Sequence, residues 1–228
     1  MEGVTIGFSP PRFLGPSFLP SGAPRSCHTH GRSPFWRYLR DERLRALYLG
    51  VMFRQKGIAG SFSLIFVYMA SLGITAGPMG VVSGLTALAQ VLGLVFFGHL
   101  ADRLGRKVIF LVGFGLSVCV APVFTLAQGV CEMAVGHLLV GTAFAALYMG
   151  STAHIGDVIP AERHAVMLGL FDSTRALGGV FGPLVAGLVM PLIGFRGMFL
   201  TMAGITTFGF LLVLAGTRTR TDVSSLPA

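Results

Sequence analysis

The sequence predicts an all-α integral membrane protein with six transmembrane helices, and three observations lead to this fold class. Of the 228 residues, 53% are hydrophobic and 11% are charged, whereas soluble domains carry roughly 25% charged residues. The charges are clustered, which leaves apolar runs of about 20 residues, the length that crosses a hydrocarbon core of roughly 30 Å. The runs are unbroken, while strands of a membrane barrel alternate polar and apolar residues over only about 10 positions. A water-soluble fold is excluded because the chain lacks the polar residues to cover these runs.

The apolar runs define the spans in chain order. The first span begins between Ala46 and Gly57. Glycine and proline inside the runs are compatible with transmembrane helices. We expect one six-helix domain over 47–216, with spans at about 48–74, 79–97, 108–127, 133–153, 166–190 and 198–216.

The segments outside this domain have different compositions. Residues 1–34 are rich in Pro, Gly and Ser without an apolar period, which predicts a disordered cytoplasmic tail. In residues 35–46, Phe35 and Trp36 are interleaved with arginines. That pattern is typical of a basic helix lying along the lipid headgroups, or of an ordinary juxtamembrane anchor. Residues 217–228 are predicted to form a second cytoplasmic tail.

The basic residues predict how the spans are oriented. Seven arginines precede the first span and three basic residues lie between the second and third spans, but Arg196 alone lies in the connections on the other side. Positive residues favour the cytoplasm. We therefore expect a multi-pass protein of the cell membrane, surrounded by membrane lipid, with both termini cytoplasmic. The same placement accounts for the net charge of +8, so no nucleic-acid partner is expected.

The ten residues from Gly98 to Lys107 form a charge-dense loop between two apolar runs. Gly98 lets a neighbouring backbone come close, and Gly105 permits a tight reversal into the next helix. Asp102 is an anion that can face the positive N-terminus of another helix. A plain stop-transfer loop would also be basic, but it would not need glycine, aspartate, glycine and a basic pair at this spacing.

This loop closely resembles the loop between helices two and three of major facilitator superfamily transporters. The resemblance implies that the loop is a gate latch rather than a substrate site, with Asp102 and Arg106 in that role. The residues of the predicted gating loop are Gly98, Asp102, Arg103, Gly105, Arg106 and Lys107.

A second resemblance lies in the fifth span, where residues 178–187 are similar to a family motif associated with proton-coupled exporters. Gly178 and Gly182 form a face of small residues for close helix approach, and Pro183 is expected to bend the helix. Gly187 completes the motif. The alternative is a tightly packed helix with no influence on transport direction. Segments 157–163 and 194–199 extend the resemblance to about 47–216.

The chain departs from the family pattern in two places. His137 stands where the family often has an arginine in the fourth helix, and a histidine is no permanent cation, which makes proton coupling through this helix doubtful. The family also has twelve helices in two halves with the substrate between them, and this chain contains one half. The resemblance therefore implies a second six-helix half, either a missing C-terminal half or a second copy.

Polar residues inside the spans are candidates for a substrate or proton cavity, because burying them in a membrane is costly. Asp172 and Arg175 are three residues apart and therefore lie on one face of the helix. Either the two residues pair with each other, or Arg175 binds an anionic substrate. Arg54 faces a cavity or extends to the headgroups. The candidate cavity residues are Arg54, Tyr68, Gln90, His137, Asp172 and Arg175.

Taken with the resemblance, these patterns favour secondary active transport of a small solute by alternating access, with proton-coupled export by an antiporter as one form. A non-transporting remnant or assembly subunit is the alternative. A rhomboid-like intramembrane protease is a third class, but no Gly-x-Ser-Gly stands in a span and no His-Glu-x-x-His is present. We expect no enzyme activity, no cofactor and no metal. The Cys27-His28-Thr29-His30 cluster offers at most three ligands and no second half-site.

Overall fold

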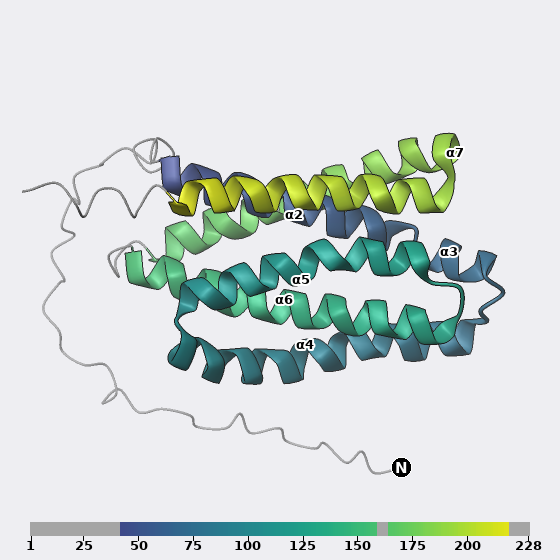
Figure 1. Cartoon of the computed structure of the whole chain (residues 1–228), viewed down its shortest axis with the longest axis horizontal. Helices are drawn as coiled ribbons and strands as arrows, with labels where there is room; N and C mark the ends of the chain where they lie inside the picture. Colours follow the sequence, from purple (N-terminus) through teal and green to yellow (C-terminus); the bar gives the residue numbers. More distant parts are fainter. Residues whose placement is uncertain (1–41, 159–163, 219–228) are drawn as a thin grey trace, which may run out of the picture. The chain divides into compact units, whose positions relative to one another are not determined.

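The computed structural model describes residues 42–158 and 164–218. The predicted tail at 1–34, most of the interfacial helix at 35–46 and most of the tail at 217–228 lie outside these residues. Every regular element of the described part is an α-helix, in agreement with the predicted fold class (Figure 1). The elements are α2 (Glu42–Ser63), α3 (Ile65–Ser71), α4 (Ala76–Leu104), α5 (Arg106–Leu126), α6 (Val130–Val158) and α7 (His164–Arg218).

Four of these helices are long and apolar enough to cross a membrane. They are α4, α5, α6 and α7. The predicted first span corresponds to α2 and α3, which are separated at Leu64. In α2 the hydroxyls of Ser61 and Ser63 donate to the carbonyl oxygens of Gly57 and Gly60, at 3.0 and 2.7 Å. Serine bonds of this kind bend helices, which agrees with the break directly after Ser63.

The 55 residues of α7 are two helical arms that meet at Gly194. At 1.5 Å per residue a straight helix of this length would extend about 80 Å, far more than a hydrocarbon core of roughly 30 Å. Gly194 has φ 69° and ψ 179°, and Figure 1 shows the green arm and the yellow arm running in opposite directions from this reversal. We call residues 164–193 the first arm and residues 195–218 the second arm.

Substitution of Gly194 by alanine is expected to lower the free energy of unfolding by about 1–3 kcal/mol, because its backbone conformation is nearly exclusive to glycine. An added Cβ would meet nothing within 4 Å, so the cost is conformational and not steric. Gly204→Ala is the matched control in the second arm, where the backbone is helical and the space is equally open. Thermal unfolding of detergent-solubilised protein measures both variants, and equal midpoints would contradict the expectation.

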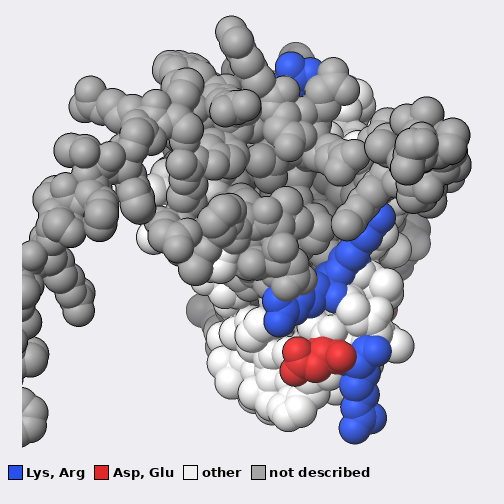
Figure 2. Space-filling view, turned by 90° about the vertical axis from the view of Figure 1, so that its left-hand side faces the viewer, with Lys and Arg blue, Asp and Glu red and all other residues white. Residues whose placement is uncertain are grey.

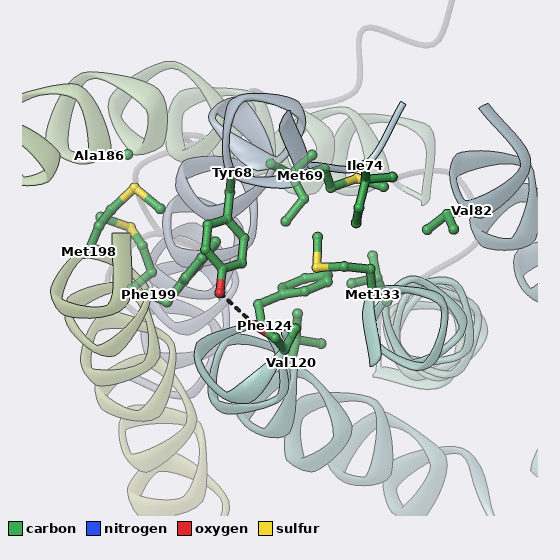
Figure 3. Packing of buried hydrophobic residues seen from close by; sticks show 14 residues of the cluster. Tyr68, Met69, Ile74, Val82, Val120, Phe124, Met133, Ala186, Met198 and Phe199 are labelled. Atoms are coloured by element: carbon green, nitrogen blue, oxygen red, sulfur yellow. Dashed lines mark hydrogen bonds between the residues drawn. The ribbon is translucent and has the colours of Figure 1, made fainter. Parts of the chain in front are cut away.

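Helix α2 packs against both arms of α7, while α6 packs against α4 and α5. A Cβ on Gly60 would lie 2.5 Å from the Met202 sulfur in the second arm and 2.9 Å from the Gly182 carbonyl oxygen in the first. A buried cluster joins residues of α3, α4, α5, α6 and both arms of α7 near the C-terminal end of α5, with Tyr68 and Phe124 at its centre (Figure 3). These contacts fix the positions of the polar residues described next.

Candidate functional site

The turn between α4 and α5 is made by Gly105 alone. Its φ of 91° is positive, a conformation that glycine adopts without a steric penalty. Its amide donates to the Ala101 carbonyl oxygen at 3.0 Å, and its carbonyl accepts from the Val108 amide at 3.2 Å. One residue therefore ends α4 and begins α5. The predicted loop from residue 98 is helical up to Leu104, so its charged residues stand on helix ends and not on a flexible connection.

Three charged residues of this turn lie open to the surroundings. Asp102, Arg103 and Lys107 are exposed, and none of them makes a hydrogen bond or an ion pair with a described residue. Arg106 is partly buried. Figure 2 views this end and shows basic side chains beside an acidic one on the surface that described residues form. A Cβ on Gly98 would meet nothing closer than the Met149 Cε at 4.0 Å, so no tight helix contact exists there.

The glycines of the fifth-span motif differ in their surroundings. A Cβ on Gly178 would run into the Met52 carbonyl oxygen, and one on Gly182 would run into the Lys56 carbonyl oxygen and lie 2.7 Å from the Gly60 amide nitrogen. Both glycines thus let the first arm of α7 contact the backbone of α2. The space at Gly187 is open, so this glycine makes no such contact. The helix continues through Pro183.

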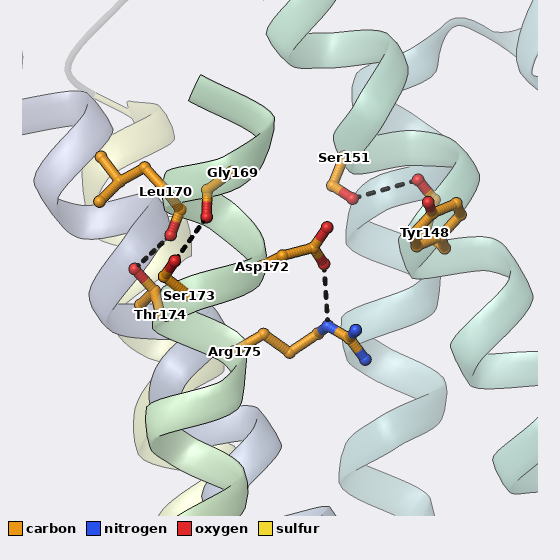
Figure 4. A network of polar contacts seen from close by, with 8 residues as sticks. All are labelled: Tyr148, Ser151, Gly169, Leu170, Asp172, Ser173, Thr174 and Arg175. Atoms are coloured by element: carbon orange, nitrogen blue, oxygen red, sulfur yellow. Dashed lines mark hydrogen bonds and ion pairs between the residues drawn. The ribbon is translucent and has the colours of Figure 1, made fainter. Parts of the chain in front are cut away.

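Asp172 and Arg175 form an ion pair on the first arm, with Arg175 Nε 3.3 Å from Asp172 Oδ1. The guanidinium also lies over the ring of Phe144 in α6, 5.9 Å from its centroid. Phe144 in turn stacks on Tyr148, with centroids 5.7 Å apart and planes 10° apart. Figure 4 shows the pair facing α6 from the first arm. Side-chain exposures of 31% for Arg175 and 52% for Asp172 leave the pair accessible beside these rings.

Arg54 lies in the interior of the bundle, with 1% of its surface exposed. Its Nε donates to Ser117 Oγ in α5 at 2.7 Å. The Ser117 hydroxyl donates to the Gly113 carbonyl oxygen at 2.6 Å, so it accepts from Arg54. The sequence left Arg54 either facing a cavity or extending to the headgroups, and the structure excludes the headgroup position.

His137 is enclosed between two aromatic rings. It is 1% exposed, and its ring centroid lies 5.3 Å from that of Phe62 in α2 and 5.5 Å from that of Phe124 in α5. Its Nδ1 is 2.8 Å from the Met133 carbonyl oxygen, which implies a proton on that nitrogen. The buried Nε2 has no hydrogen-bond partner within residues 42–158 and 164–218.

The other two cavity candidates are placed differently. Tyr68 is buried in the core, where its hydroxyl donates to the Ala127 carbonyl oxygen at 2.7 Å (Figure 3). Its ring contacts Phe195 and Phe199, with centroid distances of 5.2 Å to each. Gln90 is partly buried on α4. Their roles in a cavity stay predictions.

Two residues at these sites carry no signal in the sequence. Ser117 and Phe144 are ordinary members of apolar helices, and only the packing of α5 on α2 and of α6 on the first arm brings them to Arg54 and Arg175. The sequence shows which spans contain a serine, an aromatic residue or an arginine. It does not show which residues of two helices face each other, so it could not have matched Ser117 with Arg54 or Phe144 with Arg175.

Comparison with known proteins gives this geometry its context. Residues 47–227 match the family described as the Major Facilitator Superfamily. The chain is similar to the quinolone resistance protein NorA of Staphylococcus aureus (strain MRSA252), with 26% identity over 147 residues, 64% of this chain and 38% of that protein. It is also similar to the multidrug resistance protein MdtG of Enterobacter lignolyticus (strain SCF1), with 30% identity over 164 residues, 68% of this chain and 39% of that protein.

The matched part thus spans about two fifths of the length of these relatives. The family match covers most of the chain, and it agrees with four described helices that are long and apolar enough to cross a membrane. Together they identify a multi-pass membrane protein and not an enzyme. The chain belongs to the major facilitator superfamily of membrane transporters.

Proposed function

We propose that this chain forms the N-terminal six-helix half of a secondary transporter that exports a small solute by alternating access. The six spans are α2 with α3, α4, α5, α6 and the two arms of α7. The match over residues 47–227 carries this proposal, and the reversal at Gly194 supports the count because it divides one long helix into two membrane-length arms.

The distribution of charge supports an orientation with both termini in the cytoplasm. The start of α2, the α4–α5 turn and the end of α7 lie at the same end of the bundle (Figure 1). Basic residues gather there, whereas Arg196, next to the reversal at Gly194, is at the other end. Positive residues favour the cytoplasmic side.

A second six-helix half completes the transporter, either as a continuation of the chain or as a second copy. The relatives are matched over only 38% and 39% of their length. Large apolar side chains are exposed along α4 and along the first arm of α7, including Val91, Val95, Leu184 and Leu188. The second half covers part of this surface and membrane lipid covers the remainder.

The exposed Asp102 is the latch between the two halves. It has no ion-pair partner in the described part of its own half, and a carboxylate is stabilised at the N-terminus of another helix. Contact with a helix of the second half holds the cytoplasmic side closed, and separation of the halves breaks that contact. Arg106, the first residue of α5 after Gly105, is the second residue of this proposed latch.

We further propose that export of the solute is coupled to the movement of protons. Asp172 is an accessible carboxylate, and the enclosed His137 has a ring nitrogen without a hydrogen-bond partner among the described residues, so these two residues are the candidates for proton binding. The names of the relatives, which describe quinolone and multidrug resistance, support a small organic solute.

Flux through proteoliposomes tests the proposal. Purified chain is reconstituted with an imposed pH gradient, uptake of a quinolone is measured, and native mass spectrometry reports the oligomeric state. Gradient-driven uptake by a dimer supports a half-size subunit. Uptake only after fusion to a second six-helix half supports a fragment of a longer transporter. Absence of uptake in both forms would contradict transport and favour a remnant or an assembly subunit.

A further inference from the structure

A pair of opposite charges lies exposed within the membrane-spanning part of the first arm of α7. Residues 164–193 extend about 45 Å at 1.5 Å per residue, so a hydrocarbon core of roughly 30 Å centred on them leaves about five residues outside at each end. Asp172 and Arg175 therefore stand inside the core, with side-chain exposures of 52% and 31%. Charged groups at this depth face the bundle interior or a water-filled cavity and not lipid, which makes this face of the arm a candidate for the solute path.

The two charges are held together by a long contact. Arg175 Nε lies 3.3 Å from Asp172 Oδ1, whereas charge-assisted bonds of this kind are typically about 2.7–2.9 Å long. Both residues belong to one helix and both side chains are accessible, so the pair can open by rotation of side chains alone. An incoming charged group can therefore replace either partner without the movement of a helix.

Aromatic rings lie directly beside the pair. The guanidinium of Arg175 is 5.9 Å from the centroid of the Phe144 ring, and Phe144 stacks on Tyr148, which is 36% exposed. Figure 4 shows Arg175 and Tyr148 on facing helices. Helices α6 and α7 pack sparsely on each other, because α6 lies mainly against α4 and α5, and α7 lies mainly against α2. An aromatic group can thus come to lie beside Tyr148 without displacing a packed helix.

Charge balance selects the class of solute that this arrangement can accept. A solute with a single charge that opens the pair binds one member and leaves the other unpaired, which is costly inside a membrane. A solute with adjacent positive and negative groups compensates both members. Its ammonium group replaces Arg175 at the carboxylate of Asp172, and its own carboxylate accepts hydrogen bonds from the guanidinium, which can be two in parallel.

We propose that Asp172, Arg175, Phe144 and Tyr148 bind an aromatic zwitterion, a solute whose ring lies close to both an ammonium and a carboxylate group. This rests on the proposed transport function and specifies its substrate class. The ring of the solute packs beside the stacked pair of Phe144 and Tyr148, and contacts between aromatic rings contribute about 0.5–1.5 kcal/mol beyond the burial of area. The two charges fix the orientation of the solute along the arm.

Three probes on the unaltered protein test this inference. Phenylalanine carries both charges, whereas phenethylamine lacks its carboxylate and 3-phenylpropionate lacks its ammonium group. Each is titrated at neutral pH and constant ionic strength into the purified chain in detergent while the melting temperature is followed. Phenylalanine at roughly ten times its dissociation constant is expected to raise the melting temperature by roughly 3–6 °C, because a ligand that binds only the folded state stabilises it. The other two probes at the same concentration are expected to raise it by roughly 1–2 °C, as for tenfold weaker binding.

Variants of the pair are expected to change which probe binds best. Asp172→Asn leaves Arg175 without its anion, so 3-phenylpropionate is expected to become the strongest ligand. Arg175→Gln leaves Asp172 without its cation, so phenethylamine is expected to become the strongest. Ser173→Ala is the matched control beside the pair, since the Ser173 hydroxyl donates to the Gly169 carbonyl oxygen of its own helix. This control is expected to keep the preference for phenylalanine.

The outcomes separate this inference from the transport proposal. Equal shifts with all three probes, no saturable shift with phenylalanine, or an unchanged order of probes in both charge variants would overturn the zwitterion site. Gradient-driven flux of phenethylamine in proteoliposomes without a preference for phenylalanine would overturn it while leaving transport intact. A preference for phenylalanine without flux of any solute would support the site and contradict transport. If the charge variants fail to fold, the comparison of the three probes on the unaltered protein decides.

Discussion

Gly182→Ala is expected to destabilise the protein by about 1–3 kcal/mol, the cost of overpacking a tight core. The added Cβ would collide with the Lys56 carbonyl oxygen and the Gly60 amide of α2. Both are backbone groups, so no side chain can rotate away and the first arm of α7 must move outward. Thermal unfolding in detergent is expected to show a midpoint lowered by roughly 4–8 °C for a loss of about 2 kcal/mol.

Gly187→Ala is the matched control, five residues further along the same helix. A Cβ there would meet nothing within 4 Å, and alanine favours a helix by up to about 1 kcal/mol over glycine. The control is therefore expected to be neutral or slightly stabilising. If both substitutions lowered the midpoint equally, the close contact between α2 and the first arm would not be what stabilises the bundle.

Asp102→Asn is expected to reduce solute flux roughly tenfold, the effect of losing about 1.4 kcal/mol at a carboxylate–helix contact. The same substitution is expected to leave the free energy of unfolding unchanged or to raise it slightly. Asp102 lies in the last turn of α4, where the helix dipole disfavours a negative charge, and it has no partner among the described residues. A purely structural role would give the opposite result, with reduced stability and preserved flux.

Glu132→Gln is the control for this experiment. Glu132 is exposed in the first turn of α6, where the helix dipole favours a negative charge. Its neutralisation is expected to cost a few tenths of a kcal/mol of stability and to leave flux unchanged. Flux measured in proteoliposomes at matched protein amounts distinguishes the two positions. Equal flux losses in both variants would contradict a specific role for Asp102.

The sequence was sufficient to predict an all-helical, multi-pass membrane protein, because long apolar runs leave few alternatives. It was less informative at the ends of the helices. The second span was predicted to end near residue 97, but α4 continues to Leu104, since hydropathy marks where the membrane ends and not where the helix ends. Leucine, alanine and arginine favour a helix, so α4 extends until Gly105 reverses the chain.

The candidate site residues are brought together by contacts between helices, and a hydropathy pattern does not predict which residues make such contacts. Spacing alone brings Asp172 and Arg175 together on one helix, but their placement over Phe144 needs the register between α7 and α6. The same holds for His137, whose neighbours Phe62 and Phe124 lie on other helices. The burial of Arg54 also follows from packing and not from sequence, because an arginine at the start of an apolar run extends to the headgroups equally well.

The topology of the bundle is tested most directly by labelling single cysteines from each side of the membrane. In a background with the cysteines at 27, 119 and 131 replaced by serine, Arg103→Cys marks the α4–α5 turn and Arg196→Cys marks the reversal of α7. A membrane-impermeant maleimide is expected to label position 103 only in inverted vesicles and position 196 only in intact cells. Labelling of both positions from the same side, or with the sides exchanged, would contradict the proposed arrangement of the spans and the cytoplasmic latch.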